Sequence, residues 1–171
     1  MLKKLLLSLL VLALGGYVWL AFIGIEPLDR RPGTLLSGSP APLPDDWSLL
    51  ASEQEVHLET RPWFGIPFSV TTVIAHDNGR LYVPSLYGAV VPFPGSKYWN
   101  KVIQRDPEVR LRVGGKLYAM SATPILDPLE FERAFAALGR KYPFWQAKVE
   151  ANDSQRQFAL IRLTERQAER I

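Results

Sequence analysis

The side chains that most often carry catalysis are sparse in this sequence of 171 residues. It has no cysteine, and its only histidines, His57 and His76, stand well apart. A histidine-based metal site needs several ligands at short spacing, and thiolate chemistry needs cysteine. The sequence also has no catalytic carboxylate pair, nucleophile elbow or phosphate loop. The residues alone therefore indicate neither a metal centre nor a nucleophilic enzyme.

Aromatic residues are the side chains whose clustering suggests a ligand. They gather in the first half of the region after residue 60, as Trp63, Phe64, Tyr87, Phe93, Tyr98 and Trp99. Such rings can form a wall on which a planar ligand stacks, although they also pack cores and loops in many proteins. The run Tyr142-Pro143-Phe144-Trp145 is open to the same two interpretations, as the cover of a pocket or membrane contact, or as a packed helix end.

Charge and composition exclude one class of partner. The net charge is only +3, and the basic residues are scattered without a dense run, so no nucleic-acid surface is predicted. Arg110 and Arg112 alternate with apolar residues, which is typical of the outer face of a strand. With 47% hydrophobic and 22% charged residues, the chain is globular and long enough for one domain plus an appendage.

The appendage is the N-terminus. From Leu5 to Ile25 no residue is charged, and as a helix this stretch would span roughly 30 Å, the thickness of a hydrocarbon core. Aromatic residues suited to an interfacial belt lie near its far end: Tyr17, Trp19 and Phe22. We predict a transmembrane anchor over residues 1–25. A cleaved secretory signal is the alternative, but its apolar region is usually shorter and ends at small residues.

The orientation of this anchor follows from its flanks. Lys3 and Lys4 precede it, whereas Arg30 and Arg31 follow it. Because a short N-terminal tail normally stays in the cytoplasm, the domain is expected on the outer side, which is periplasmic in a Gram-negative bacterium. Residues 26–46 are rich in proline and glycine and are predicted to be a linker, leaving residues 47–171 as the domain.

This domain is predicted to be mainly β with covering helices. Short β-branched and aromatic runs predict strands at residues 55–60, 68–75, 81–83, 109–113, 116–125 and 157–163. The turns Asp77-Asn78-Gly79 and Gly114-Gly115 predict two hairpins. Helices are expected over residues 96–105 and from Asp127-Pro128, where Asp127 can cap. About six strands with two helices favour a small antiparallel barrel, which closes its own edges.

Several motifs fit this order of elements. Residues 99–109 read WNKVIQRDPEV, which is similar to a motif of one protein family, Trp-x-x-Asn-Leu followed by Asn-Pro-x-Val. Gly114-Gly115 and Tyr142-Pro143 also fall where that family has the same residues. Over roughly residues 55–163 the chain resembles the split β-barrel flavoproteins, in the branch of deazaflavin-dependent nitroreductases related to pyridoxamine phosphate oxidase. The family's phosphate segment, Gly-Arg-Lys-Ser-Gly-x-Pro-Arg, appears as RPWFGIPF at residues 61–68, and Val102 replaces the helix asparagine.

The resemblance implies a coenzyme, FMN or a deazaflavin, and residues to hold it. Lysine or arginine must neutralise its phosphate, because an unpaired buried phosphate is costly. The implied cofactor-binding residues are Lys97 and Arg61 for the phosphate, Ser85, Thr71 and Thr72 as hydrogen-bonding partners, and Trp99. The alternative is that Lys97 and Arg61 are surface charges and the threonines only strand formers.

Two functions follow from this interpretation. The first is a membrane-anchored oxidoreductase in which a flavin or deazaflavin carries the hydride chemistry on a small, lipophilic substrate. The second is a binding protein of the same fold that holds a lipid or another apolar ligand without a coenzyme, which the apolar substitutions at residues 61–68 favour. The resemblance also implies a homodimer.

Overall fold

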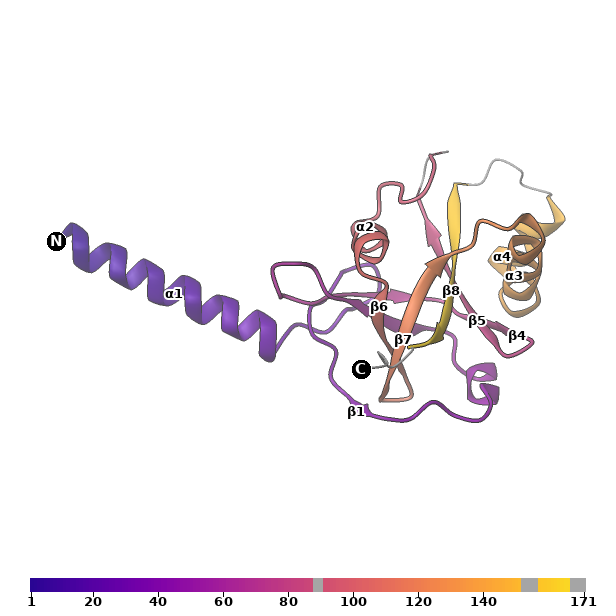
Figure 1. The fold of residues 1–171 in the computed structure, drawn as a ribbon, viewed down its shortest axis with the longest axis horizontal. Coiled ribbons are helices and arrows are strands. Elements are labelled where there is room, and N and C mark those ends of the chain that lie inside the picture. The colour runs from indigo at the N-terminus through magenta and orange to yellow at the C-terminus, as the bar shows by residue number, and fades with distance from the viewer. Residues whose placement is uncertain (88–90, 152–156, 167–171) are drawn as a thin grey trace, which may run out of the picture.

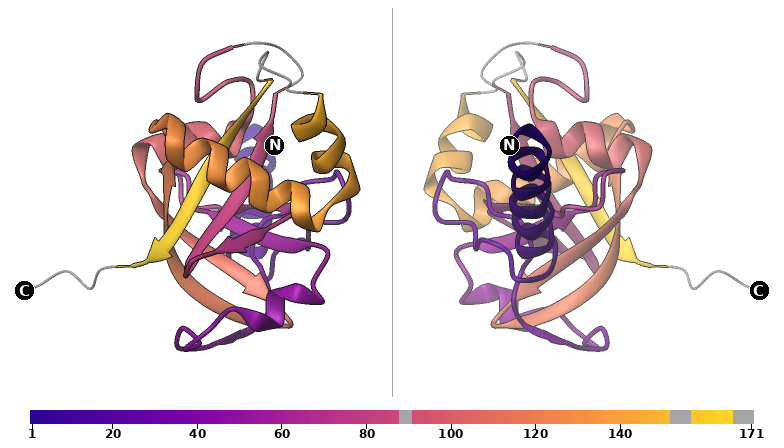
Figure 2. Two further views of the ribbon diagram at one scale, coloured as in Figure 1. Left: turned by 90° about the vertical axis from the view of Figure 1, so that its right-hand side faces the viewer. Right: turned by 90° about the vertical axis from the view of Figure 1, so that its left-hand side faces the viewer.

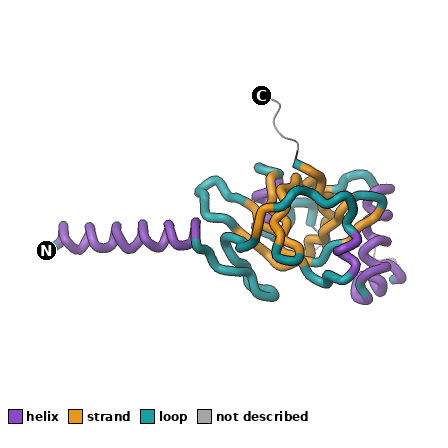
Figure 3. Tube along the Cα trace, turned by 90° about the horizontal axis from the view of Figure 1, so that it is seen from below, coloured by secondary structure: helices purple, strands orange, loops and turns teal. Residues whose placement is uncertain are grey.

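The structure, a computed structural model, describes residues 1–87, 91–151 and 157–166. A single long helix, α1 (Leu2–Phe22), projects from a rounded body formed by the rest of the described chain (Figure 1 and Figure 3). None of the residues of α1 is buried. By length and composition α1 is apolar enough to cross a membrane.

One curled sheet forms the body. Its strands are β1 (Ser39–Pro40), β2 (Val56–Thr60), β3 (Phe68–Thr72), β4 (Ala75–Asp77), β5 (Arg80–Leu86), β6 (Glu108–Val113), β7 (Lys116–Pro124) and β8 (Phe158–Glu165). The order is β3-β2-β6-β7-β8-β5-β4 with antiparallel pairs throughout, and β1 adds a short parallel pair with β7. β3 and β4 end this order, yet only Val73 and Ile74 separate them in the chain. The sheet must therefore curl until its two ends meet, which confirms the predicted mainly β, antiparallel split barrel.

Local sequence explains the strands. In β6 the side chains of Val109, Leu111 and Val113 are buried, while Arg110 and Arg112 between them are only partly so. Gly114 and Gly115 follow with φ of 54° and 77°, a left-handed turn that glycine adopts at little cost and that returns the chain into β7. The predicted 109–125 hairpin is thus present.

Three helices and a 3-10 turn cover the barrel: η1 (Ser48–Ala51), α2 (Tyr98–Arg105), α3 (Pro128–Lys141) and α4 (Pro143–Glu150). Asp127 caps α3, because its carboxylate accepts from the amides of Leu129 and Glu130. α3 lies across the outside of β5 and β8 with α4 beside it (Figure 2), and the two helices enclose a second apolar cluster that includes Phe135, Trp145 and Phe158. α2 instead sends Trp99 and Ile103 into the interior cluster of the barrel. The second of the two expected helical regions is therefore two helices, with Tyr142 between them and Pro143 as the first residue of α4.

The proline-rich segment 26–46 lies against the barrel. Gly33 exchanges two backbone hydrogen bonds with Ser69 of β3, and the side chain of Leu36 is 2% exposed. Arg112 of β6 pairs with Glu26 at 2.7 Å. The boundaries of anchor, linker and domain stay predictions, and the barrel holds this predicted linker in several places.

A buried ion pair ties this segment to the sheet. The carboxylate of Glu59, which is 2% exposed, receives hydrogen bonds of 2.6 to 2.9 Å from Arg110. Its Oε2 also accepts from the amide of Leu36 at 2.7 Å. A buried carboxylate is tolerated only when it is paired and fully hydrogen-bonded. Arg110 therefore supports the fold, as its expected position on the strand's outer face allows.

We predict that Arg110→Met lowers the free energy of unfolding by about 3 kcal/mol, because it leaves the buried carboxylate of Glu59 without its cation. The matched control is Arg166→Met, since Arg166 pairs with Glu108 where both side chains are about half exposed, and the loss there should stay under about 1 kcal/mol. Urea unfolding of the detergent-solubilised chain, followed by tryptophan fluorescence, measures both. Equal losses would contradict the assigned role of Arg110.

Candidate functional site

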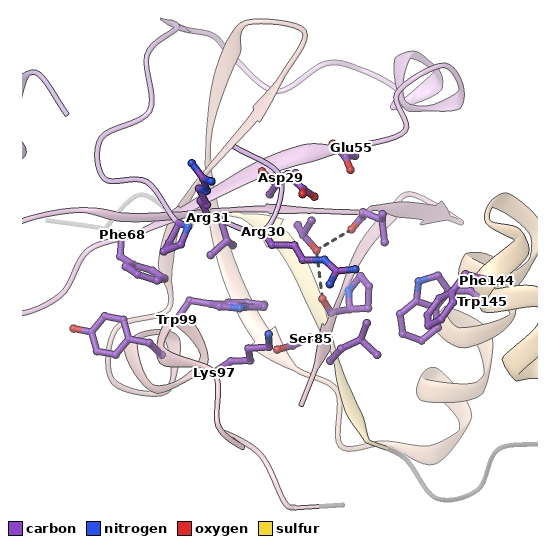
Figure 4. Close-up of a pocket in the computed structure, with 18 residues that line it drawn as sticks. Asp29, Arg30, Arg31, Glu55, Phe68, Ser85, Lys97, Trp99, Phe144 and Trp145 are labelled. Carbon is purple, nitrogen blue, oxygen red and sulfur yellow. Dashed lines mark hydrogen bonds between the residues drawn. The ribbon is translucent and has the colours of Figure 1, made fainter. Parts of the chain in front are cut away.

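A pocket of about 650 Å³ lies at the split in the barrel, between β3 and β5. β5 pairs with β8 from Leu81 to Leu86, but β4 covers its other edge only from Arg80 to Tyr82. The second half of β5 therefore has a free edge that faces β3. The hydroxyl of Thr72 reaches the carbonyl of Pro84 at 3.4 Å across this split, one of the bonds drawn in Figure 4.

Six segments enclose the pocket. Besides β3 and the second half of β5, they are residues 29–32, Glu55 just before β2, the start of α2 and the start of α4. Among the residues implied by the resemblance, the pocket is lined by Thr71, Thr72, Ser85, Lys97 and Trp99. Arg61 is not among the lining residues and is exposed on the loop after β2. The structure thus brings five of the six together, and their binding of a cofactor stays a prediction.

Two hydroxyl groups at this pocket have no hydrogen-bond partner among the residues that the structure describes. Ser85 is 2% exposed, and its Oγ makes no hydrogen bond within the described part of the chain. The same holds for Oγ1 of Thr71. Leaving a buried hydroxyl unpaired costs about 1 to 3 kcal/mol, so such groups usually mark a water or ligand site. Both residues line the pocket, which makes their hydroxyl groups candidates for contact with a ligand.

Positive charge gathers beside Ser85. Lys97 is the N-cap residue of α2, whose first turn has no side-chain cap, so amide donors at that end are available to an anion. In Figure 4 Lys97 reaches toward Ser85, while Arg30 extends into the pocket from the opposite wall. The carboxylates of Asp29 and Glu55 lie on the far side of this view from Lys97. The pocket therefore has a cation on each of two facing walls, an arrangement suited to a phosphate or carboxylate held between them.

Sequence reasoning missed the two arginines of this pocket. Arg30 and Arg31 both line it, and they are held there by a tight turn in which Leu28 and Arg31 exchange backbone hydrogen bonds. The bridge from Gly33 to Ser69 then fixes the segment along the edge of β3. No local pattern predicts this contact, because a proline-rich run does not specify which part of a fold it will pack against.

The aromatic lining differs from the predicted wall. Of its six members only Tyr98 and Trp99 line the pocket, joined by Phe68, Phe144 and Trp145. Tyr98 packs edge to face on Phe68, with ring centroids 5.0 Å apart. Trp63 and Phe64 are exposed outside the pocket, and Phe93 packs against the barrel interior. Tyr87 is also outside the lining, and burial raises the pKa of its phenol to about 12.

The sequence leaves residues 142–145 open to two interpretations, a pocket or membrane cover and a packed helix end, and different residues of the run fit each. Trp145 is 2% exposed and packs edge to face on Phe158, so it belongs to a packed helix while also reaching the pocket. Phe144 is 57% exposed at the rim. Among the residues that the structure describes, no group of three or more His, Asp or Glu could hold a metal ion.

No family model matches this sequence, and no curated protein does either. Solved structures do match. A Listeria innocua protein assigned as a pyridoxamine 5'-phosphate oxidase is 16% identical, with a TM-score of 0.51 over 70% of this chain and 90% of that one. A domain-swapped dimer is also 16% identical, with a TM-score of 0.52 over 66% and 81%.

A third structure widens the range of ligands found on this fold. The haem storage protein HutZ from Vibrio cholerae is 12% identical, with a TM-score of 0.51 over 70% of this chain and 87% of its own. Identities this low establish shared architecture and nothing about the ligand. The chain has the split-barrel fold of the pyridoxamine 5'-phosphate oxidase-like proteins.

Proposed function

We propose that this protein is a membrane-anchored oxidoreductase that binds a flavin or deazaflavin in the pocket between β3 and β5. Its substrate would be small and lipophilic. The observation that carries the proposal is the buried, unpartnered hydroxyl of Ser85 beside Lys97 and the uncapped start of α2. The fold, shared with a protein assigned as a pyridoxamine 5'-phosphate oxidase, is compatible with it.

The pocket residues fit such a coenzyme. A volume of about 650 Å³ lies within the usual range of about 300 to 1,000 Å³ for cofactor sites. Lys97 and Arg30 would neutralise the phosphate, and Ser85 and Thr71 would donate hydrogen bonds. Trp99 offers an aromatic face to the ring system. When bound, the coenzyme supplies hydride transfer, and the chain supplies position and electrostatics.

In this scheme Arg30 replaces Arg61, which the resemblance implies as a phosphate ligand. Arg61 is outside the lining residues, whereas Arg30 extends into the pocket. Since Arg30 belongs to the segment held by Gly33 and Ser69, a bound phosphate would bridge this segment and the barrel. Ligand binding is then expected to stabilise the contact between them.

A binding protein for a lipid or another apolar ligand is the second candidate. Exposed apolar side chains at the pocket favour it, with Phe144 57% and Leu86 40% exposed. A neighbour of the same fold is a haem storage protein, so this architecture also serves binding. FMN and deazaflavin are made in the cytoplasm, so an outward-facing domain would favour this candidate too.

Membrane anchoring is part of the proposal. Between Leu5 and Leu14, every large apolar side chain of α1 is more than half exposed. Such exposure is unfavourable in water and expected in lipid. We propose a cytoplasmic N-terminus with the barrel on the outer side. A cleaved signal predicts a shortened N-terminus, which the intact mass of the membrane-extracted protein detects. The same extract, sized by mass photometry, tests the homodimer.

We predict that the purified full-length chain binds FMN or a deazaflavin and that Lys97→Ala weakens this binding. Loss of a charge-assisted contact to phosphate should raise Kd by about 10-fold to 100-fold. Lys101→Ala is the matched control, because Lys101 is exposed on the same helix outside the pocket lining. Coenzyme fluorescence titration measures Kd. If neither coenzyme binds the wild type, the enzyme is refuted and the apolar-ligand protein remains.

We predict that Ser85→Ala weakens coenzyme binding without lowering stability. Its Oγ has no partner in the described chain, so its removal takes no hydrogen bond from the fold. Ser69→Ala is the control, since Oγ of Ser69 is likewise buried and unpartnered but lies outside the pocket lining. Thermal unfolding with and without coenzyme measures both effects. Equal coenzyme affinity in the two variants would exclude Ser85 from the site.

A further inference from the structure

The loop between β2 and β3, residues 61–67, presents aromatic side chains to the outside. Trp63 is 77% exposed and Phe64 39%, and their rings pack edge to face with centroids 5.7 Å apart. The amide of Gly65 donates to the carbonyl of Pro62 at 3.0 Å, which closes a tight turn beneath them. Exposed tryptophan and phenylalanine on a fixed turn are typical of surfaces that meet a membrane.

This loop is bonded to α1. The hydroxyl of Tyr17 donates to the carbonyl of Phe64 at 2.9 Å. A Cβ atom on Gly65 would lie only 2.8 Å from the same hydroxyl, and Gly65 has a φ of 83°, so a side chain there would be doubly unfavourable. Figure 1 and Figure 3 both show a loop of the barrel reaching out beside the near end of α1.

The place of this bond along α1 sets the depth of the loop. Tyr17 precedes the helix end at Phe22 by five residues, which corresponds to about 7.5 Å along the axis. With α1 in a bilayer, Tyr17 lies below the level at which the helix leaves the lipid. A loop bonded to its hydroxyl is then drawn at least to the boundary between headgroups and acyl chains.

We propose that Trp63 and Phe64 dock into the surface of the same phospholipid bilayer that α1 crosses. They extend the aromatic belt that Trp19 and Phe22, exposed on α1, begin. This inference rests on the anchoring proposed above and adds a second membrane contact to it. Because β3 follows the loop directly and lines the pocket, docking holds the pocket close to the lipid.

The chain has no cysteine, so Trp63→Cys introduces a single site for an environment-sensitive NBD label. Leu126→Cys is the matched control, because Leu126 is 83% exposed and lies two residues before α3. Figure 1 shows α3 on the side of the barrel away from α1. Both labelled full-length chains are reconstituted in phosphatidylcholine–phosphatidylglycerol vesicles. Spin-labelled lipid should quench NBD at position 63 several-fold more than at 126, and aqueous iodide should show the reverse.

Flotation with the vesicles separates this proposal from the anchoring on which it rests. If the chain floats and iodide reaches position 63 as readily as position 126, docking is refuted and the anchor stands. If the chain fails to float, both the membrane anchor and the docking of the loop are refuted. Tyr17→Phe removes the bond to Phe64 and should increase iodide quenching at position 63 without changing flotation. Unchanged quenching in that variant would show that the bond does not set the depth of the loop.

Discussion

The corner between β3 and β4 determines the shape of the whole body. Ile74, which is fully buried, turns the chain from one end of the sheet to the other. The hydroxyl of Tyr142 accepts from its amide at 3.2 Å and lies 2.9 Å from its carbonyl, while Lys141 donates to that carbonyl at 3.0 Å. Burial lowers the pKa of Lys141, yet its ammonium satisfies backbone oxygens that the corner leaves unpaired. Two residues at the end of α3 thereby hold the barrel shut at this point.

Closure at one corner leaves the barrel open further along. β3 and β5 diverge beyond the bond from Thr72 to Pro84, and an open sheet edge needs cover. Gly33 covers the outer part of β3, and its neighbours Arg30 and Arg31 consequently line the split. The pocket, the arginines that line it and the packing of the proline-rich segment therefore follow from one feature: β3 and β5 do not pair with each other.

Local signals predicted the local features well. Asp127 before Pro128 marked the start of α3, and Gly114-Gly115 marked the turn between β6 and β7. The resemblance implies Lys97 and Ser85 as binding residues, and both line the same pocket. Contacts between distant segments were not predictable, because nothing in a proline-rich run specifies that Leu36 bonds to Glu59. The same holds for Arg30, whose place depends entirely on such contacts.

The position of the altered phosphate segment in the fold changes what its apolar residues imply about coenzyme binding. In the family that the chain resembles, this segment binds phosphate, so its apolar version at residues 61–68 suggested a lost coenzyme. Here residues 61–67 lie outside the pocket lining, and only Phe68 reaches it. Apolar residues on this loop therefore remove no charge from the pocket, because Lys97 and Arg30 supply positive charge there. The same substitutions give the loop the composition of a membrane contact, next to the helix that its backbone already touches.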